Sequence, residues 1–255
     1  MFGKIIGYSI VFFWLTMTTL FIKKEILPTL PQLTDPSYKA ILKHLKDFKP
    51  SQMGIYLFNK RIGYTKTVIS RQPDNNYYKI TNITKIEKIP SGQIVLPAGI
   101  DISGYSLVNL SYQLDSFDFS ITSPMINLTY QIKGKVNGSS LELNIWDGKK
   151  METSRRPFQP NTIVSHGFSP FTSMPHLSVG KQWASSMINP LSGQVESTTA
   201  RVEEKTTLVW QEKEYEVYEV VLDYKKFQFR AWITPAGDIL KQEALIPGLY
   251  LLKEE

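Results

Sequence analysis

From Met53 onward, apolar residues recur at every second position, which is the period of a half-buried strand. Gly54–Ser70 predicts a strand, a tight turn at Asn59-Lys60 and a second strand, because Asn is one of the few residues that tolerate a positive φ. Tyr77–Ile89 also alternates, with apolar residues on both faces, and Asn137-Gly138 is the strongest hairpin signal in the chain. The sequence therefore predicts a mainly β domain.

Further alternating runs extend this pattern almost to the C-terminus. Together they predict about a dozen antiparallel strands in meander order, with one long interruption. A sheet of that size curls, so we expect a strongly curved antiparallel sheet or an open barrel. The further predicted strands are Tyr105–Leu114, Phe117–Thr122, Met125–Val136, Ser140–Trp146, Gln182–Met187, Val195–Trp210, Glu214–Asp223, Lys226–Thr234, Ile239–Leu245 and Leu249–Leu252.

The interruption is the segment Met151–Gly180, whose four prolines exclude a central strand. We expect either an ordered loop that covers one end of the β structure or a lid over a cavity. If the segment is a lid over a lipid or an acyl chain, its apolar side chains are the candidate ligand-binding residues, namely Phe158, Phe168, Phe171 and Met174.

One amphipathic helix is predicted ahead of the sheet, over Asp35–Lys49. Asp35 is a suitable N-cap and Pro36 occupies the first helical position. We expect the helix to pack its apolar stripe on the β domain, where it fills or flanks the mouth of the sheet; the alternative is a helix lying on a membrane surface. The stripe consists of Tyr38, Ile41, Leu42, Leu45 and Phe48.

The N-terminal stretch Ile5–Ile22 holds eighteen residues without a charge, between Lys4 and the pair Lys23-Lys24. At about 1.5 Å per residue it makes a helix of roughly 27 Å, near the lower limit for crossing a bilayer. We therefore predict a transmembrane anchor over residues 1–24, a stalk over 25–34 and a β-rich domain over 35–255. The anchor residues include Ile5, Phe12, Phe13, Trp14, Leu20 and Ile22.

A cleaved signal peptide is the alternative to a retained anchor, but the residues before Lys23 lack the small side chains of a cleavage site. Lysines flank both ends of the apolar stretch, so charge does not decide the orientation. The absence of cysteine and the many Asn, Ser and Thr residues in predicted turns favour an extracytoplasmic domain. We expect a single-pass membrane protein with its domain on the periplasmic or extracellular side.

The net charge of +6 is unevenly distributed along the chain. Residues 1–100 hold 14 Lys or Arg against 5 Asp or Glu, so the positive charge lies close to the predicted anchor. Anionic headgroups attract basic residues within a Debye length of the bilayer. Because no cluster of Lys and Arg interleaves with aromatic residues, we expect no nucleic-acid partner.

No group of residues in the sequence has the spacing of a catalytic or metal site. The three histidines, His44, His166 and His176, lack the short spacing of zinc ligands. Asp115 and Asp118 flank a predicted turn, where such pairs are usually solvated. The chain also lacks the nucleophile-elbow, P-loop and dinucleotide motifs. We therefore expect no enzymatic activity, no metal and no cofactor.

The residues Gly54, Tyr56, Lys60, Gly63 and Tyr64 form a hairpin pattern, G-x-Y-x-x-x-K-x-x-G-Y. This pattern resembles the β-rich region that precedes the catalytic domain in bacterial membrane-associated transglutaminase-like proteins. The later parts of the chain that share the resemblance are Val179–Trp183, Asn189–Ser192, Ala231–Ile233, Gly237 and Ile239–Glu243.

The resemblance covers about residues 53–252 and implies the β fold and an exported location, but not the activity. Transglutaminase-like enzymes need a Cys-His-Asp set, and this chain has no cysteine. The strand pattern is also similar to the half-barrel of periplasmic lipoprotein carriers. We predict a membrane-anchored docking or accessory subunit for an envelope or membrane protein; the alternatives are a lipid-binding module and an uncharacterised enzyme.

Overall fold

The computed structural model describes residues 14, 16–18, 38–42, 50–72, 76–91, 94–160, 162–165, 174, 177–189, 193–224, 227–244 and 246–254. Among them, no helix is both long enough and apolar enough to span a bilayer. Of the predicted anchor residues, Trp14 is described and is exposed. The others, Ile5, Phe12, Phe13, Leu20 and Ile22, lie outside the described residues.

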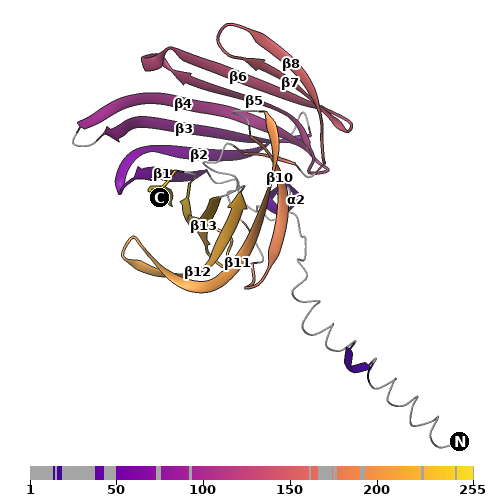
Figure 1. The fold of residues 1–255 in the computed structure, drawn as a ribbon, viewed down its shortest axis with the longest axis vertical. Helices are drawn as coiled ribbons and strands as arrows, with labels where there is room; N and C mark the ends of the chain where they lie inside the picture. Colours follow the sequence, from indigo (N-terminus) through magenta and orange to yellow (C-terminus); the bar gives the residue numbers. More distant parts are fainter. Residues whose placement is uncertain are drawn as a thin grey trace, which may run out of the picture.

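Nearly all of the described chain belongs to one curled sheet of fifteen strands (Figure 1). The two-residue side-chain period of the sequence is the reason, because strands such as β2 and β5 turn alternate residues into the core. The strands are β1 (Ser51–Leu57), β2 (Lys60–Gln72), β3 (Tyr77–Ser91), β4 (Ile94–Asn109), β5 (Leu114–Ser123), β6 (Leu128–Asn137), β7 (Ser140–Trp146), β8 (Met151–Pro157), β9 (Ile163–Val164), β10 (Gln182–Asn189), β11 (Gln194–Trp210), β12 (Lys213–Tyr224), β13 (Phe227–Ile233), β14 (Ile239–Glu243) and β15 (Leu249–Lys253).

The chain enters the sheet in its middle and returns there. It runs outward from β1 to β8 at one edge, restarts at β9 on the other edge, and comes back to β15, which pairs with β1. Residues 158–162 alone connect β8 to β9. Five linking residues span at most about 20 Å, so the sheet must curl until its two edges approach each other.

Parts of the curled sheet that are distant in the strand order meet at two places. A Cβ built on Gly193, in the connection from β10 to β11, would lie 3.1 Å from δ-carbons of both Ile132 and Leu143, on β6 and β7. The β10–β11 connection in the second half of the sheet therefore lies against inner side chains of the first half, and in the view of Figure 1 one end of β10 overlaps the ribbon of β5. On the β9 side, the Val164 amide donates a hydrogen bond to the Tyr38 phenol.

The short helix α2 (Tyr38–Leu42) is part of the core. Tyr38, Ile41 and Leu42 are buried and belong to the main hydrophobic cluster, with side chains from both halves of the sheet. This confirms, for these three residues, that the predicted helix packs on the β domain. The described helix is shorter than the predicted Asp35–Lys49, and the rest of that segment, including Leu45 and Phe48, lies outside the described residues.

The structure corrects the first predicted hairpin. Its turn is Phe58-Asn59 rather than Asn59-Lys60, and both residues have positive φ, 47° and 63°. Phe58 tolerates this backbone because its amide donates to the Gly248 carbonyl and its ring packs against that glycine, where a Cβ would lie 2.5 Å from the ring. A contact almost two hundred residues away along the chain, rather than local turn preference, therefore sets the turn.

The structure also corrects the predicted interruption. Met151–Gly180 contains β8 and the two-residue β9, so the sheet has fifteen strands rather than about a dozen. β8 is an edge strand that ends at Pro157, a position where a missing N–H is tolerated. β9 pairs in parallel with β10, which no meander rule predicts. Before β6, the segment Pro124–Ile126 is a 3-10 turn rather than strand.

The strand connections divide the sheet into two ends. We call the end that holds the β1–β2 turn the Phe58 end, and the end where β1 begins the Ser51 end. Because neighbouring strands from β1 to β8 and from β10 to β15 are antiparallel, the connections alternate between the two ends. The Phe58 end holds the connections β1–β2, β3–β4, β5–β6, β7–β8, β10–β11, β12–β13 and β14–β15.

Candidate functional site

The four predicted ligand-binding residues do not form a described cluster. Phe158 is buried in the main core at 7 % exposure. Met174 is partly buried against the same core, and its amide donates to the Gly237 carbonyl in the connection from β13 to β14. Phe168 and Phe171 lie outside the described residues. Met174 thus lies against the Ser51 end, while the lid itself remains a prediction.

The wall of the sheet is interrupted beside β13. The ladder between β13 and β14 holds three residue pairs, from Ala231 opposite Gln242 to Ile233 opposite Ile239. Residues 227–230 pair with β12 on one side, whereas among the described residues they have no ladder partner on the β14 side. β14 and β15 are five residues long and β13 is seven, and the residues of β13 that lack a partner on this side leave a gap in the wall at the Phe58 end.

A pocket of about 300 Å³ occupies this gap, and we call it the window pocket. β13 supplies one of its walls, and β14, the β14–β15 connection and β15 supply the other. Its volume is near the lower limit for small-ligand sites. The lining residues are Phe227, Gln228, Phe229, Lys241, Glu243, Ala244, Ile246, Pro247, Gly248, Leu249 and Tyr250.

The two sides of the window pocket differ in chemistry. Ala231 and Leu251 point into the core, so strand alternation places Phe227, Phe229 and Leu249 on the inner side. The intervening lining residues, Gln228, Lys241, Glu243 and Tyr250, belong to the outer face of the sheet. The window pocket is therefore apolar toward the core and polar toward the outside.

Aromatic rings fix the outer wall of the window pocket. The Lys241 ammonium lies 4.7 Å from the Trp232 ring centre and 5.4 Å from that of Tyr250. Tyr250 stacks on Tyr56 with 5.3 Å between ring centres, and its phenol donates to Asn59. Burial, and then the nearby Tyr56, raise the pKa of Tyr250. Among the described residues no ion pair of Lys241 is found, and its ammonium interacts with the faces of these two rings.

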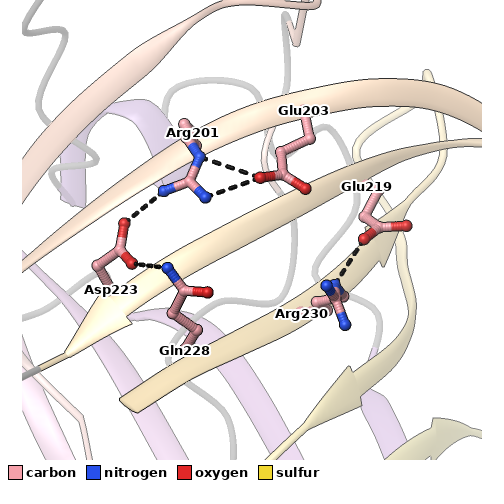
Figure 2. Close-up of polar contacts among 6 residues, drawn as sticks. All are labelled: Arg201, Glu203, Glu219, Asp223, Gln228 and Arg230. Carbon is pink, nitrogen blue, oxygen red and sulfur yellow. Dashed lines mark hydrogen bonds and ion pairs between the residues drawn. The ribbon is translucent and has the colours of Figure 1, made fainter. Parts of the chain in front are cut away.

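Gln228 is held in place by an ion-pair network on the outer face of β11–β13, drawn in Figure 2. The Gln228 amide donates to Asp223 at 2.7 Å, and Asp223 accepts from Arg201, which also donates to Glu203. The hydrogen bond to Glu203 is the main cause that raises the pKa of Arg201. These groups are largely exposed, so the network orients Gln228 more than it stabilises the fold.

A second ion pair links β2 to the residue that follows β15, across β1. Arg61 on β2 binds Glu254 through two hydrogen bonds of 2.7 and 3.0 Å, and it holds the pKa of that carboxyl below its usual value. The pair crosses Gly54, where a Cβ would lie 2.4 Å from a Glu254 oxygen. Gly63 of the same sequence pattern faces the Lys85 carbonyl, only 1.9 Å from where a Cβ would stand. Both glycines are thus explained by close approach.

Exposed apolar side chains gather at the Phe58 end. Twelve large apolar residues of the described sheet and its connections are exposed, and nine of them lie in, or within three residues of, a connection at this end. The other three, Leu110, Val179 and Val209, lie at the Ser51 end. The nine are Phe58, Ile89, Met125, Ile126, Leu128, Met151, Val195, Phe227 and Ile246.

No family model matches the chain, and no curated protein matches it. A solved structure has a similar fold. It is a crystal structure of a β-barrel-like protein, a domain of unknown function called DUF1849, from Brucella abortus. The TM-score is 0.51 at 8 % identity, over 80 % of this chain and 94 % of that one. At this identity the likeness shows the fold alone, a mainly β, barrel-like sheet, and the resemblance to transglutaminase-associated regions remains a prediction.

The described residues contain no group of three or more potential metal ligands. All three histidines lie outside them. Asp115 accepts from Tyr77 and Ser116, and Asp118 from Gln131 and Lys133, so these two carboxylates have ordinary structural partners. Sequence reasoning did not predict the window pocket, because the pocket depends on where a ladder between two strands stops.

Proposed function

We propose that this protein is a non-enzymatic, membrane-anchored docking or accessory subunit of an envelope or membrane protein complex, with its β domain on the periplasmic side. The observation that supports this most is the concentration of exposed apolar side chains at the Phe58 end, where the window pocket also lies. Single exposed apolar residues are normal on protein surfaces, whereas a concentration of them is typical of an interaction surface.

Site-specific photo-crosslinking of the full chain in its native membrane tests the docking function. A crosslinking residue in place of Ile126 or Phe227, at the Phe58 end, is expected to give one discrete protein adduct. Val209 provides the matched control, because it is equally apolar and exposed but lies at the Ser51 end. Equal adducts at both ends, or none at either, would refute docking through the Phe58 end.

The same experiment distinguishes the lipid-binding alternative. The window pocket supports that alternative to the extent that it has an apolar inner side and one lysine without a described acidic partner. Adducts to lipid rather than to protein at Phe227, absent at Ile126, would favour a lipid-binding module over a docking subunit.

The orientation of the domain is tested separately. If the domain is periplasmic, protease added to intact spheroplasts should digest the chain beyond about Lys24 and leave the anchor. Cleavage only after the membrane is permeabilised would place the domain on the other side, and the periplasmic docking function would then be rejected.

A further inference from the structure

We propose that the window pocket binds an extended segment of the partner protein, which pairs its backbone with β13. This inference deepens the docking function proposed above and rests on it. It adds the chemistry of the partner element: a strand with alternating apolar and polar side chains, rather than a helix, a loop or a lipid.

The backbone of β13 lacks a described ladder partner on the side of the window pocket. Phe227–Arg230 forms ladder pairs with β12 on one side, and on the side of the window pocket the ladder to β14 stops at Ala231. A strand with one unpaired side presents N–H and C=O groups in the geometry that another strand satisfies best. Edge pairing of this kind is a common mode of peptide recognition.

The wall opposite β13, made of β14, the β14–β15 connection and β15, has hydrogen-bond partners of its own. The β14–β15 connection is bonded to its own side of the gap: the Ala244 amide donates to the Leu249 carbonyl, and the Leu249 amide to the Ile246 carbonyl. The Gly248 carbonyl accepts from Phe58 in the β1–β2 turn. The described residues of the connection are thus bonded to one another and to the β1–β2 turn, and no backbone hydrogen bond joins them to β13.

The side chains that line the window pocket match those of an extended peptide. A strand lying in the gap would direct successive side chains alternately to the inner and the outer side of the sheet. The inner side offers Phe227, Phe229 and Leu249, while the outer side offers Lys241 and Glu243. An acyl chain would match only the inner side, and a helix would not match the two-residue period. An extended peptide with apolar residues at every second position matches both sides.

Disulfide trapping tests this inference, because the chain has no cysteine and a single introduced thiol is unique. The probe is a set of nine-residue peptides. Each has a lysine at both ends and alternating valine and threonine residues between them. In each peptide of the set, one cysteine replaces a different residue. Each peptide cysteine is supplied as its mixed disulfide with 2-mercaptoethanol, and the peptides are equilibrated with full-length Gln228→Cys in mild detergent. The introduced thiol attacks this disulfide, forms the protein–peptide disulfide and releases 2-mercaptoethanol. Strand pairing predicts that trapped yield alternates along the peptide, with neighbouring positions differing at least about fivefold.

Three controls sharpen the result. Lys241→Cys, on the opposite wall, should show the same two-residue alternation, which guards against local damage by the first variant. Val209→Cys, at the Ser51 end, should show no alternation. Peptides N-methylated at alternate residues cannot complete the ladder and should lose the alternation at both pocket positions.

Uniform yields along the peptide, or yields that N-methylation leaves unchanged, would overturn strand pairing. That result would leave the docking function standing, because docking is judged by the crosslinks at Ile126 and Phe227. Conversely, loss of those crosslinks would reject docking at this end even if model peptides were trapped at the window pocket.

Discussion

Tyr38 offers the sharpest test of how the sheet is closed. Its side chain is buried at 3 % exposure, and its phenol oxygen accepts a 3.0 Å hydrogen bond from the buried amide of Val164 on β9. The phenol is also hydrogen bonded to Ser106 on β4. Tyr38→Phe keeps the ring but leaves these buried groups without their partner, so the substitution isolates the polar link between α2 and the edge of the sheet.

The expected loss at neutral pH follows from the unpaired groups. A buried donor left unsatisfied costs about 1–3 kcal/mol, so the free energy of unfolding should fall by that amount. For a domain of this size, each kcal/mol lowers Tm by roughly 2–4 °C. Tyr105→Phe is the matched control: its ring lies half-buried under Lys79, and a change within about 0.5 kcal/mol is expected.

The effect of Tyr38→Phe on the free energy of unfolding should also depend on pH, and the direction follows from the pKa of Tyr38. Burial raises the pKa of Tyr38 from 10.0 to about 12. Below pH 10 the phenol is neutral in the folded and the unfolded chain, so its contribution is fully present. Between pH 10 and 12 only the unfolded chain loses the proton of Tyr38, so through this residue the wild-type protein loses up to about 2.7 kcal/mol of stability that Tyr38→Phe does not lose.

Urea unfolding of the full chain in mild detergent, followed by tryptophan fluorescence at pH 7, 9, 10 and 11, measures both effects. The difference in unfolding free energy between wild type and Tyr38→Phe should be largest at pH 7 and shrink above pH 10. Amide hydrogen exchange at Val164 should accelerate in the variant. If the two proteins differ by the same amount at every pH and exchange at Val164 is unchanged, the proposed link between α2 and β9 is wrong.

Four further substitutions test local contacts. Gly63→Ala should cost about 1–3 kcal/mol in urea titration because its Cβ meets a backbone carbonyl, whereas Gly138→Ala, with open space but φ of 61°, should cost about 1–2 kcal/mol. Glu254→Gln should lose the acid-dependent part of stability: Arg61 lowers this pKa, so its contribution exists above the unfolded pKa and disappears as pH falls through the folded value. Arg155→Val removes an exposed charge from edge strand β8 and should promote concentration-dependent association in size-exclusion chromatography.

Strand positions could be predicted from the sequence because the information is local. The predicted Ser140–Trp146 coincides with β7, and Val195–Trp210 differs from β11 by one residue. In both cases a two-residue period is bounded by a turn at which φ is positive. Gly138 lies before β7, and Gln211-Glu212 follow β11. Fold class follows from many such runs, so the mainly β prediction is confirmed.

The closure of the sheet could not be predicted, because it depends on contacts between distant residues. The pairing of β1 with β15 joins residues almost two hundred positions apart, and the two-residue β9 is too short to show a period. The candidate site has the same origin. Phe227, Lys241 and Ile246 are unremarkable in sequence, and they surround a pocket only because the ladder between β13 and β14 ends at Ala231.

The position of α2 determines where the folded domain must begin. The segment that follows the predicted anchor does not stop at the domain surface, because Tyr38, Ile41 and Leu42 insert three buried side chains into the main core. Burial of each apolar side chain is worth about 1.5–3 kcal/mol, so together they approach the whole net stability of a typical domain, about 5–15 kcal/mol. A shortened chain beginning at Ser51 would keep every strand and still lose this contribution, and its circular dichroism should show an unfolded or molten sheet. We therefore place the start of the domain before Tyr38, which makes α2 a structural part of the sheet that it closes.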